Sequence, residues 1–398
     1  MNNKQKIILI VSIVLGIIII VVASILIAAA VYGKSLKVHT STELDGINEE
    51  MRNILYYASI VGNSHNTQLW NLKISKQKNH NNGEIEIRYN KDRTLNVVDP
   101  NNREAYLSIG HYIENLIVLL KAYGYEANIS YPKAKLYNKQ QESISSPVSF
   151  IQYAKKESFQ IDFQNVQELL NLIEKRHSNK GSFKKDQIQQ NHYNILKEKF
   201  GNYIHIYSNG DSNFNYIKDN SINAVKSQSS DQRYRDELAE WLRFSNKESN
   251  EKLDGINADM MGFHGLKKGF YYMTIHRKTA KGKKFANQGI STAKKQLKNC
   301  GFFILITGEM NNDGFDFISQ IIEIGRMSQR IWFECTRIGI SLQPFSAILE
   351  VDPYKSQIQK DFHLNDPIQM IFRSGYSKKY GSNIKLRRNL KDYIEVMK

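Results

Sequence analysis

Residues 173–183, IEKRHSNKGSF, place three basic side chains and a hydroxyl within the five positions from Arg176 to Lys180. They follow residues 163–173, whose apolar positions have the spacing of an amphipathic helix. Arginine offers a planar pair of hydrogen-bond donors, lysine a compact charge and serine a neutral donor, so this group suits a phosphate monoester. A solvated basic turn would have the same composition, and these residues alone leave both interpretations open.

The composition bounds the class of protein. The chain has 398 residues, of which 41% are hydrophobic and 11% aromatic, enough for one large domain or two ordinary ones with a sizeable core. Its net charge of +16 is spread along the whole length without a nucleic-acid-binding signature, so no nucleic-acid partner is expected. The ten histidines lack metal-ligand spacing, and Cys300 and Cys335 lie in apolar surroundings. We therefore expect no metal site and two buried thiols.

Residues 7–32 contain no charged side chain and are rich in Ile, Val, Leu and Ala. As a helix they would measure about 39 Å, enough to cross a hydrocarbon layer of about 30 Å. Because the apolar part of a signal peptide has only about 7–15 residues, an uncleaved single-pass anchor is expected. Residues 1–6 then form a short tail and residues 33–42 a linker. Basic residues flank both ends, so the side of the membrane that carries residues 43–398 is left open.

Apolar periodicity predicts the secondary structure of the remaining chain. The expected helices lie at 48–61, 103–123, 163–173, 231–244 and 315–338, and the expected strands at 84–89, 94–98, 125–131, 302–307, 340–342 and 368–374. Residues 132–160 are expected to form a polar connector. Residues 266–300 contain ten Lys or Arg and no acid, and their glycines argue against one continuous helix. A mobile lid, a contact with an anionic membrane and a solvated loop are the alternatives for this segment.

One order of elements occurs twice. A long helix ends at a glycine and is followed by a strand, once at Gly124 and once at Gly339. The expected fold class is therefore α+β, with two similar units at 43–160 and 161–398 that pack as a fused pseudo-dimer.

Several motifs are similar to FMN-dependent nitroreductases. Arg-His-Ser-x-Lys at 176–180 resembles the phosphate clamp of that family, and NSHNTQLW at 63–70 resembles its Pro-Ser-x-x-Asn-x-Gln-Pro-Trp stretch. The segments at 99–124, 235–241 and 336–344 and the tail at 387–390 resemble a double-length branch. Asn63, Leu69 and Asn389 replace family prolines. The resemblance begins near residue 43 and implies a nitroreductase-like fold.

In ordinary members of this family, FMN lies at a homodimer interface and contacts both subunits. Here each half carries only one of the two motifs, which implies a single FMN site in a chain that acts as a monomeric pseudo-dimer. The resemblance assigns the phosphate to Arg176, Ser178, Lys180, Lys385 and Arg387, and a flavin or ribityl contact to His177. It assigns further FMN contacts to Asn63, Ser64, His65, Asn66 and Gln68, and the reactive edge of the ring to the backbone of Pro344–Ser346.

The resemblance also implies an activity. NAD(P)H would reduce FMN by hydride transfer, and a nitroaromatic, a quinone or a similar acceptor would then take the electrons; no protein acid or base is obligatory, and none is named as catalytic. The sequence contains no GxGxxG or Walker motif. Two alternatives are a protein of the same fold that binds or sequesters flavin without turnover, and a structural membrane protein with a basic interaction surface.

Overall fold

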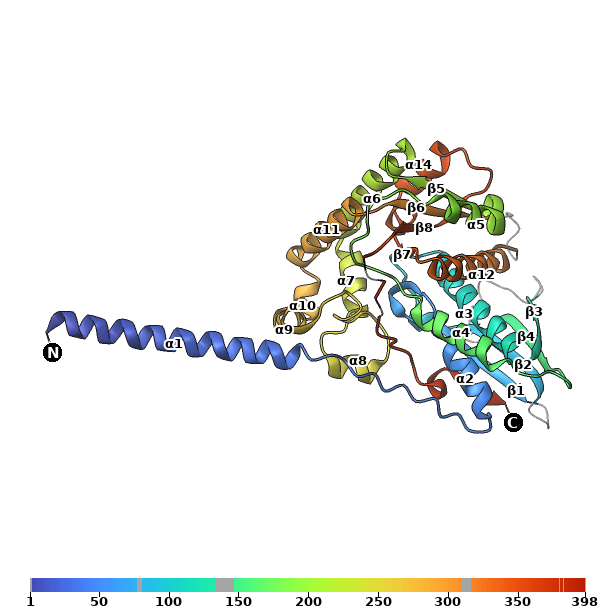
Figure 1. The fold of residues 1–398 in the computed structure, drawn as a ribbon, viewed down its shortest axis with the longest axis horizontal. Helices are drawn as coiled ribbons and strands as arrows, with labels where there is room; N and C mark the ends of the chain where they lie inside the picture. The colour runs from blue at the N-terminus through green and yellow to red at the C-terminus, as the bar shows by residue number, and fades with distance from the viewer. Residues whose placement is uncertain are drawn as a thin grey trace.

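The computed structural model describes residues 2–76, 81–132, 147–309, 316–378, 380, 381 and 383–397. Helices and strands are mixed in one body, from which the N-terminal helix projects as a rod (Figure 1). The helices are α1 (Asn3–Tyr32), α2 (Glu49–Ala58), α3 (Arg103–Ala122), α4 (Phe163–Lys175), α5 (Gln190–Phe200), α6 (Ser212–Ser230), α7 (Gln232–Trp241), α8 (Asn246–Lys252), α9 (Gly265–Thr274), α10 (Arg277–Ala280), α11 (Lys283–Lys298), α12 (Asp316–Arg337), α13 (Ala347–Glu350) and α14 (Tyr354–Asp361). The strands are β1 (Trp70–Lys76), β2 (Asn82–Tyr89), β3 (Tyr125–Ser130), β4 (Pro147–Lys155), β5 (Ile204–Ser208), β6 (Phe302–Thr307), β7 (Ser341–Pro344), β8 (Ile368–Gly375) and β9 (Ile394–Met397).

Helix α1 contains the predicted apolar run of residues 7–32. Its large apolar side chains are exposed on every face, and Ala29 is the buried residue near its end. A helix that is hydrophobic all round is not stable in water without a covering partner. By length and composition, with a mean hydropathy of 3.3 over its most apolar window, α1 could cross a membrane.

Two sheets form the framework. The first has the order β3-β4-β2-β1-β9, in which β9 pairs parallel with β1 and brings the C-terminus to the edge of a sheet built from the first half of the chain. The second has the order β5-β6-β8-β7 and is antiparallel. Strand β6 is buried on both faces, as its continuous apolar run predicts: Phe302 and Ile304 join one core cluster, and Phe303 and Leu305 another.

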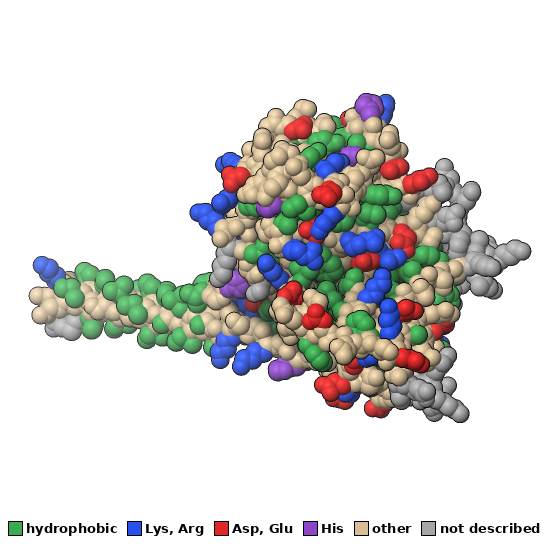
Figure 2. All heavy atoms as spheres, turned by 45° about the vertical axis from the view of Figure 1, so that its right-hand side comes forward, with side chains coloured by type: hydrophobic (Ala, Val, Ile, Leu, Met, Phe, Trp, Pro, Cys, Tyr) green, Lys and Arg blue, Asp and Glu red, His purple; other side chains and the backbone are tan. Residues whose placement is uncertain are grey.

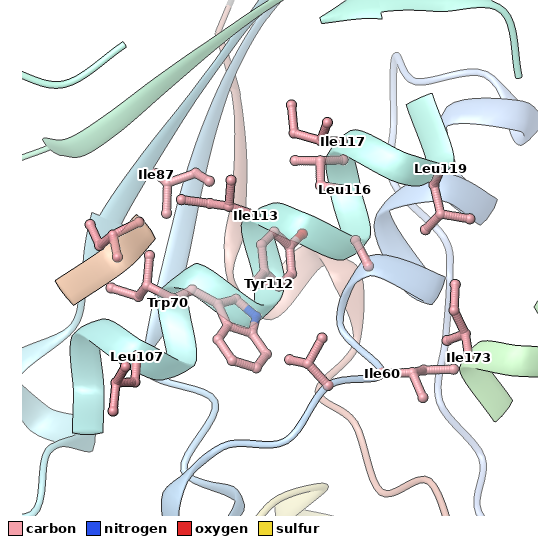
Figure 3. Close-up of a cluster of buried hydrophobic side chains, with 14 of the residues drawn as sticks. Ile60, Trp70, Ile87, Leu107, Tyr112, Ile113, Leu116, Ile117, Leu119 and Ile173 are labelled. Atoms are coloured by element: carbon pink, nitrogen blue, oxygen red, sulfur yellow. The ribbon is translucent and has the colours of Figure 1, made fainter. Parts of the chain in front are cut away.

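Helices α3 and α12 pack against each other at the centre. They cross at Gly110 and Gly325, where a Cβ on either residue would lie under 3.0 Å from backbone atoms of the other helix. Around this crossing, one hydrophobic cluster joins α2, α3, α12 and both sheets. Figure 3 shows part of it, where Trp70 and Tyr112 stack with ring centroids 4.9 Å apart. The two helices that end before Gly124 and Gly339 therefore share a core, while their pseudo-twofold equivalence stays a prediction.

Two expectations about local structure were wrong, and one alternative is excluded. Residues 94–98 form turns instead of a strand, because the carboxylate of Glu237 accepts the amide hydrogens of Val97 and Val98 that a neighbouring strand would otherwise bind. The expected connector at 132–160 contains β4, which pairs with β2 and β3; its residues 133–146 lie outside the described part of the chain. Of the alternatives for segment 266–300, the solvated loop is excluded, since the segment forms the helices α9, α10 and α11, which are separate as its glycines indicate.

Candidate functional site

A cavity of about 470 Å³ is lined by residues from 61–111 and from 176–387. This volume is within the range of about 300–1,000 Å³ that is usual for cofactor pockets. Its walls come from both predicted motifs, from α3 and α12, from α10 and α11, and from the segment 383–390, which we call the C-terminal arm. Twelve of the thirteen residues predicted for the site line it: Asn63, Ser64, His65, Asn66, Arg176, His177, Ser178, Lys180, Pro344, Ser346, Lys385 and Arg387.

Arg176 is the most informative residue of this cavity. It caps the C-terminal end of α4, and its side chain is only 3% exposed. The guanidinium lies over the Trp332 ring, 4.5 Å from the centroid, but its Nε and Nη1 have no hydrogen-bond partner among the described residues. Burial and the nearby Arg387 lower the pKa of Arg176 to about 9. A buried cation with two free donors is costly unless an anion binds it.

Two lysines add positive charge around Arg176. Lys180 lines the same cavity, and burial lowers the pKa of its ammonium to about 8. The Lys385 ammonium donates to the backbone oxygen of Arg176 at 2.8 Å, and burial, Arg176 and Arg387 lower its pKa well below the usual range. Repulsion of Lys385 by Arg176 and Arg387, beside a second buried lysine, is typical of an anion-binding site.

The loop that carries these groups is held by its neighbours. Asn179 donates to the backbone oxygen of Tyr380 and to the Ser341 hydroxyl, which fixes the loop to β7. His177 contacts the Lys175 backbone oxygen through Nδ1 at 2.8 Å and stands edge-on to Tyr380. Burial lowers the pKa of His177 to about 4, so the ring is neutral at pH 7. The role of Asn179 in holding this loop was not predicted from the sequence.

Residues 63–66 also line the cavity, and the loop at 63–68 to which they belong has a strained backbone. His65, Asn66 and Gln68 have φ values of 48°, 54° and 52°, which side chains other than glycine rarely adopt. The Asn63 side chain accepts the backbone N–H of Gln68 and closes the loop on itself. The Nδ1 atom of His65 is buried without a hydrogen-bond partner among the described residues, and burial lowers the pKa of this ring to about 4.

Three of the predicted residues use their polar groups within the protein. Arg387 donates to the backbone oxygens of Ser59 and Val61 and to the Asn66 side chain. The Asn66 amide in turn donates to Gly255 and Leu386. Gln68 does not line the cavity: its amide donates to Leu253 and accepts from the Arg388 backbone. The loop at 63–68 is thus fixed to the C-terminal arm by Arg387, Asn66 and Gln68. Their positions in the motifs did not predict this structural role.

A carboxyl pair that the sequence did not predict also lines the cavity. Glu104, in the first turn of α3, hydrogen bonds to Glu350 at the end of α13 and accepts from the Ser64 hydroxyl at 2.5 Å. Burial and the charge of Glu104 raise the pKa of Glu350 well above its usual range. Burial opposes ionisation of Glu104, but Arg103 and hydrogen bonds from Glu350 and Ser64 together lower its pKa. These opposite shifts favour protonation of Glu350 before Glu104.

The cavity also contains residues for which the sequence gave little signal. Trp332 was visible only as one position of an amphipathic helix, and Glu350 only as an acid after an apolar stretch. The basic segment 266–300 also lines the cavity, through Ala280, Phe285, Ala286 and Gly289. This segment is therefore part of the site and not simply a solvated loop.

No protein-family model matches the chain. No curated protein matches it in sequence. Among solved structures, the chain is similar to the FMN-dependent nitroreductase NfnB from Mycobacterium smegmatis in complex with NADPH, with 12% identity and a TM-score of 0.33 over 55% of this chain and 90% of that one. A likeness at this level assigns no activity to the chain.

Proposed function

We propose that this protein is a membrane-anchored, FMN-dependent oxidoreductase of the nitroreductase type, with one flavin site built by the two halves of a fused pseudo-dimer. It takes hydride from NAD(P)H and reduces a nitroaromatic, a quinone or a similar acceptor. The proposal is supported by the two sequence motifs that resemble nitroreductases, and by the position of most of their residues around one cavity.

The observation that carries the proposal is the unpartnered guanidinium of Arg176. The phosphate of FMN is a dianion near neutral pH and has several strong acceptor oxygens, so it complements Nε and Nη1 of Arg176 and the Lys180 ammonium. Arg387 contributes its charge, although its donors are occupied by the protein. The donor set therefore fits a phosphate monoester.

The chain's own residues have distinct tasks in this proposal. Arg176 and Lys180 hold the phosphate, and the strained loop at 63–68 supplies another part of the wall. Bound FMN would supply the two-electron hydride chemistry. The Glu350 carboxyl holds a proton at the wall of the cavity, and Ser346 and Gln228 hold that carboxyl in place.

The test uses the full-length chain in lipid nanodiscs, because α1 packs on α9 and its removal would expose the apolar surface between them. Titration with FMN, followed by flavin fluorescence, is expected to reach one flavin per chain, and NAD(P)H oxidation should then depend on an added quinone or nitro compound. Saturable binding without NAD(P)H oxidation would instead favour a flavin-binding protein without turnover. Absence of flavin binding would refute the proposal. The anchor is tested separately: full-length protein should stay in the membrane pellet through a carbonate wash at high pH.

A further inference from the structure

Helix α9 is fixed to the end of α1 by very close packing. A Cβ on Gly269 would lie under 3.0 Å from the backbone of Ala29, and one on Gly33 would come equally close to the backbone of Gly265. Small residues at such positions let two helix backbones approach each other. Lys268, fully buried, donates to the backbone oxygen of Lys34 at 2.9 Å and pairs with Asp259 at 2.5 Å. The orientation of α9 relative to α1 is thus rigidly set.

The outer face of α9 is apolar and unpartnered in the structure. Leu266, Phe270 and Met273 are 47%, 39% and 39% exposed, and their spacing places them on one face of the helix. Outside α1, few large apolar side chains of the described residues are as exposed, and these three are neighbours. A contiguous exposed apolar face of this kind marks an interaction surface.

The segment that contains this face is basic. The segment 266–300 has ten Lys or Arg and no acid, and Lys267, Lys278, Lys283 and Lys284 are exposed. Figure 2 shows basic side chains beside the place where the apolar rod joins the body. An amphipathic helix with an apolar face and flanking lysines has the composition of helices that lie in the interface of an anionic membrane.

The position of α9 along α1 agrees with such an interface. The crossing involves Ala29 and Gly33, and the apolar run ends at Tyr32. At 1.5 Å per residue, α9 contacts α1 within roughly 6 Å of the end of this run. Interfacial helices bury their apolar face about 5–10 Å into the boundary between headgroups and acyl chains. If α1 spans the bilayer, α9 must therefore lie at the depth where Leu266, Phe270 and Met273 would meet lipid.

We propose that α9 lies in the membrane interface, with Leu266, Phe270 and Met273 in the acyl boundary and the neighbouring lysines on anionic headgroups. This inference rests on the proposed membrane span of α1. The body would then be attached to the bilayer at two points, through the spanning helix α1 and the interfacial helix α9. Two points of attachment fix the orientation of the body on the membrane. The wall of the cavity that α10 and α11 form belongs to the same segment and lies next to this contact.

The experiment measures the depth of single fluorescent labels in the full-length chain. Cys300 and Cys335 are buried and unpaired, so a new cysteine on the surface can be labelled selectively with an environment-sensitive dye. The variants are Phe270→Cys on α9, Ile18→Cys in the middle of α1, and Phe163→Cys on α4, a 74% exposed control. The vesicles contain phosphatidylcholine with about a quarter phosphatidylserine, and lipids brominated near the headgroup or deep in the acyl chain serve as quenchers.

The label at 270 is expected to be quenched by shallow bromines, the label at 18 by deep bromines, and the label at 163 by neither. Quenching at 18 without quenching at 270 would overturn the interfacial helix while leaving the anchor intact. Lack of quenching at 18 would refute the anchor, and the inference with it. A blue-shifted label at 270 that lipids do not quench would indicate a protein partner on this face, which also overturns the proposal. Reversal of charge at Lys278, Lys283 and Lys284 should reduce the quenching at 270.

Discussion

Replacement of Arg176 by methionine is the sharpest perturbation of the proposed site. Methionine has a similar length and can still pack on Trp332, but it removes the charge and the two free donors, Nε and Nη1. A hydrogen bond to a charged group contributes about 1.5–3 kcal/mol, so loss of two amounts to roughly 3–6 kcal/mol. At about 1.4 kcal/mol per factor of ten, the dissociation constant of FMN should rise by two to four orders of magnitude.

The same variant should have the opposite effect on the flavin-free protein. Arg176 is a buried cation without a paired carboxylate among the described residues, and Arg387 repels it. Its removal should leave the free energy of unfolding unchanged or raise it, because an uncompensated buried charge is eliminated. A protein that loses FMN affinity while it keeps or gains stability would show that Arg176 serves binding rather than folding.

The assay is a fluorescence titration with FMN together with chemical unfolding of the flavin-free protein. Arg337→Met is the matched control, since Arg337 pairs with Glu334 near the exposed end of α12 and does not line the cavity. Unchanged FMN affinity in the Arg176 variant would refute its assignment to the phosphate. Two flavins per chain would refute the single composite site.

Three further predictions concern pH and packing. FMN affinity should fall as the pH rises through about 8, where Lys180 loses its proton in the free protein, and Lys180→Arg should remove this fall in a titration across pH. Because burial and the charge of Glu104 raise the folded-state pKa of Glu350, the protonated Glu350 carboxyl contributes stability below its unfolded-state pKa, and this stability is lost as the pH rises through the folded-state pKa; Glu350→Gln should flatten this decline in the free energy of unfolding. Gly325→Ala should destabilise the fold by about 1–3 kcal/mol, because the new methyl would meet the backbone of Leu107, whereas Gly289→Ala, whose methyl meets nothing, should not.

The helices and strands that could be predicted are those whose apolar spacing along the chain reveals them without knowledge of distant contacts. Strand β6 follows from its continuous apolar run, because both of its faces are buried. Helix α3 follows from the helical spacing of its apolar residues, although it is buried on nearly every side in the structure. The strand expected at 94–98 failed, since the acceptor of its amides is the distant carboxylate of Glu237. Strand β9 was not predicted because its four residues are too few to show an apolar alternation. It is a strand because it pairs with the distant strand β1.

The sequence by itself determined the apolar length of α1, the positions of the central helices and the residue types of the loop that is proposed to bind phosphate, because periodicity, helix-ending glycines and donor chemistry are local properties. Only the tertiary structure decided which donors are free. Arg176 and Arg387 are equally basic in the sequence, but Arg387 donates to Ser59, Val61 and Asn66, whereas Arg176 has two donors without a partner. The pairing of Glu104 with Glu350 is likewise a tertiary contact, since only folding brings such distant carboxyls close enough to hydrogen bond.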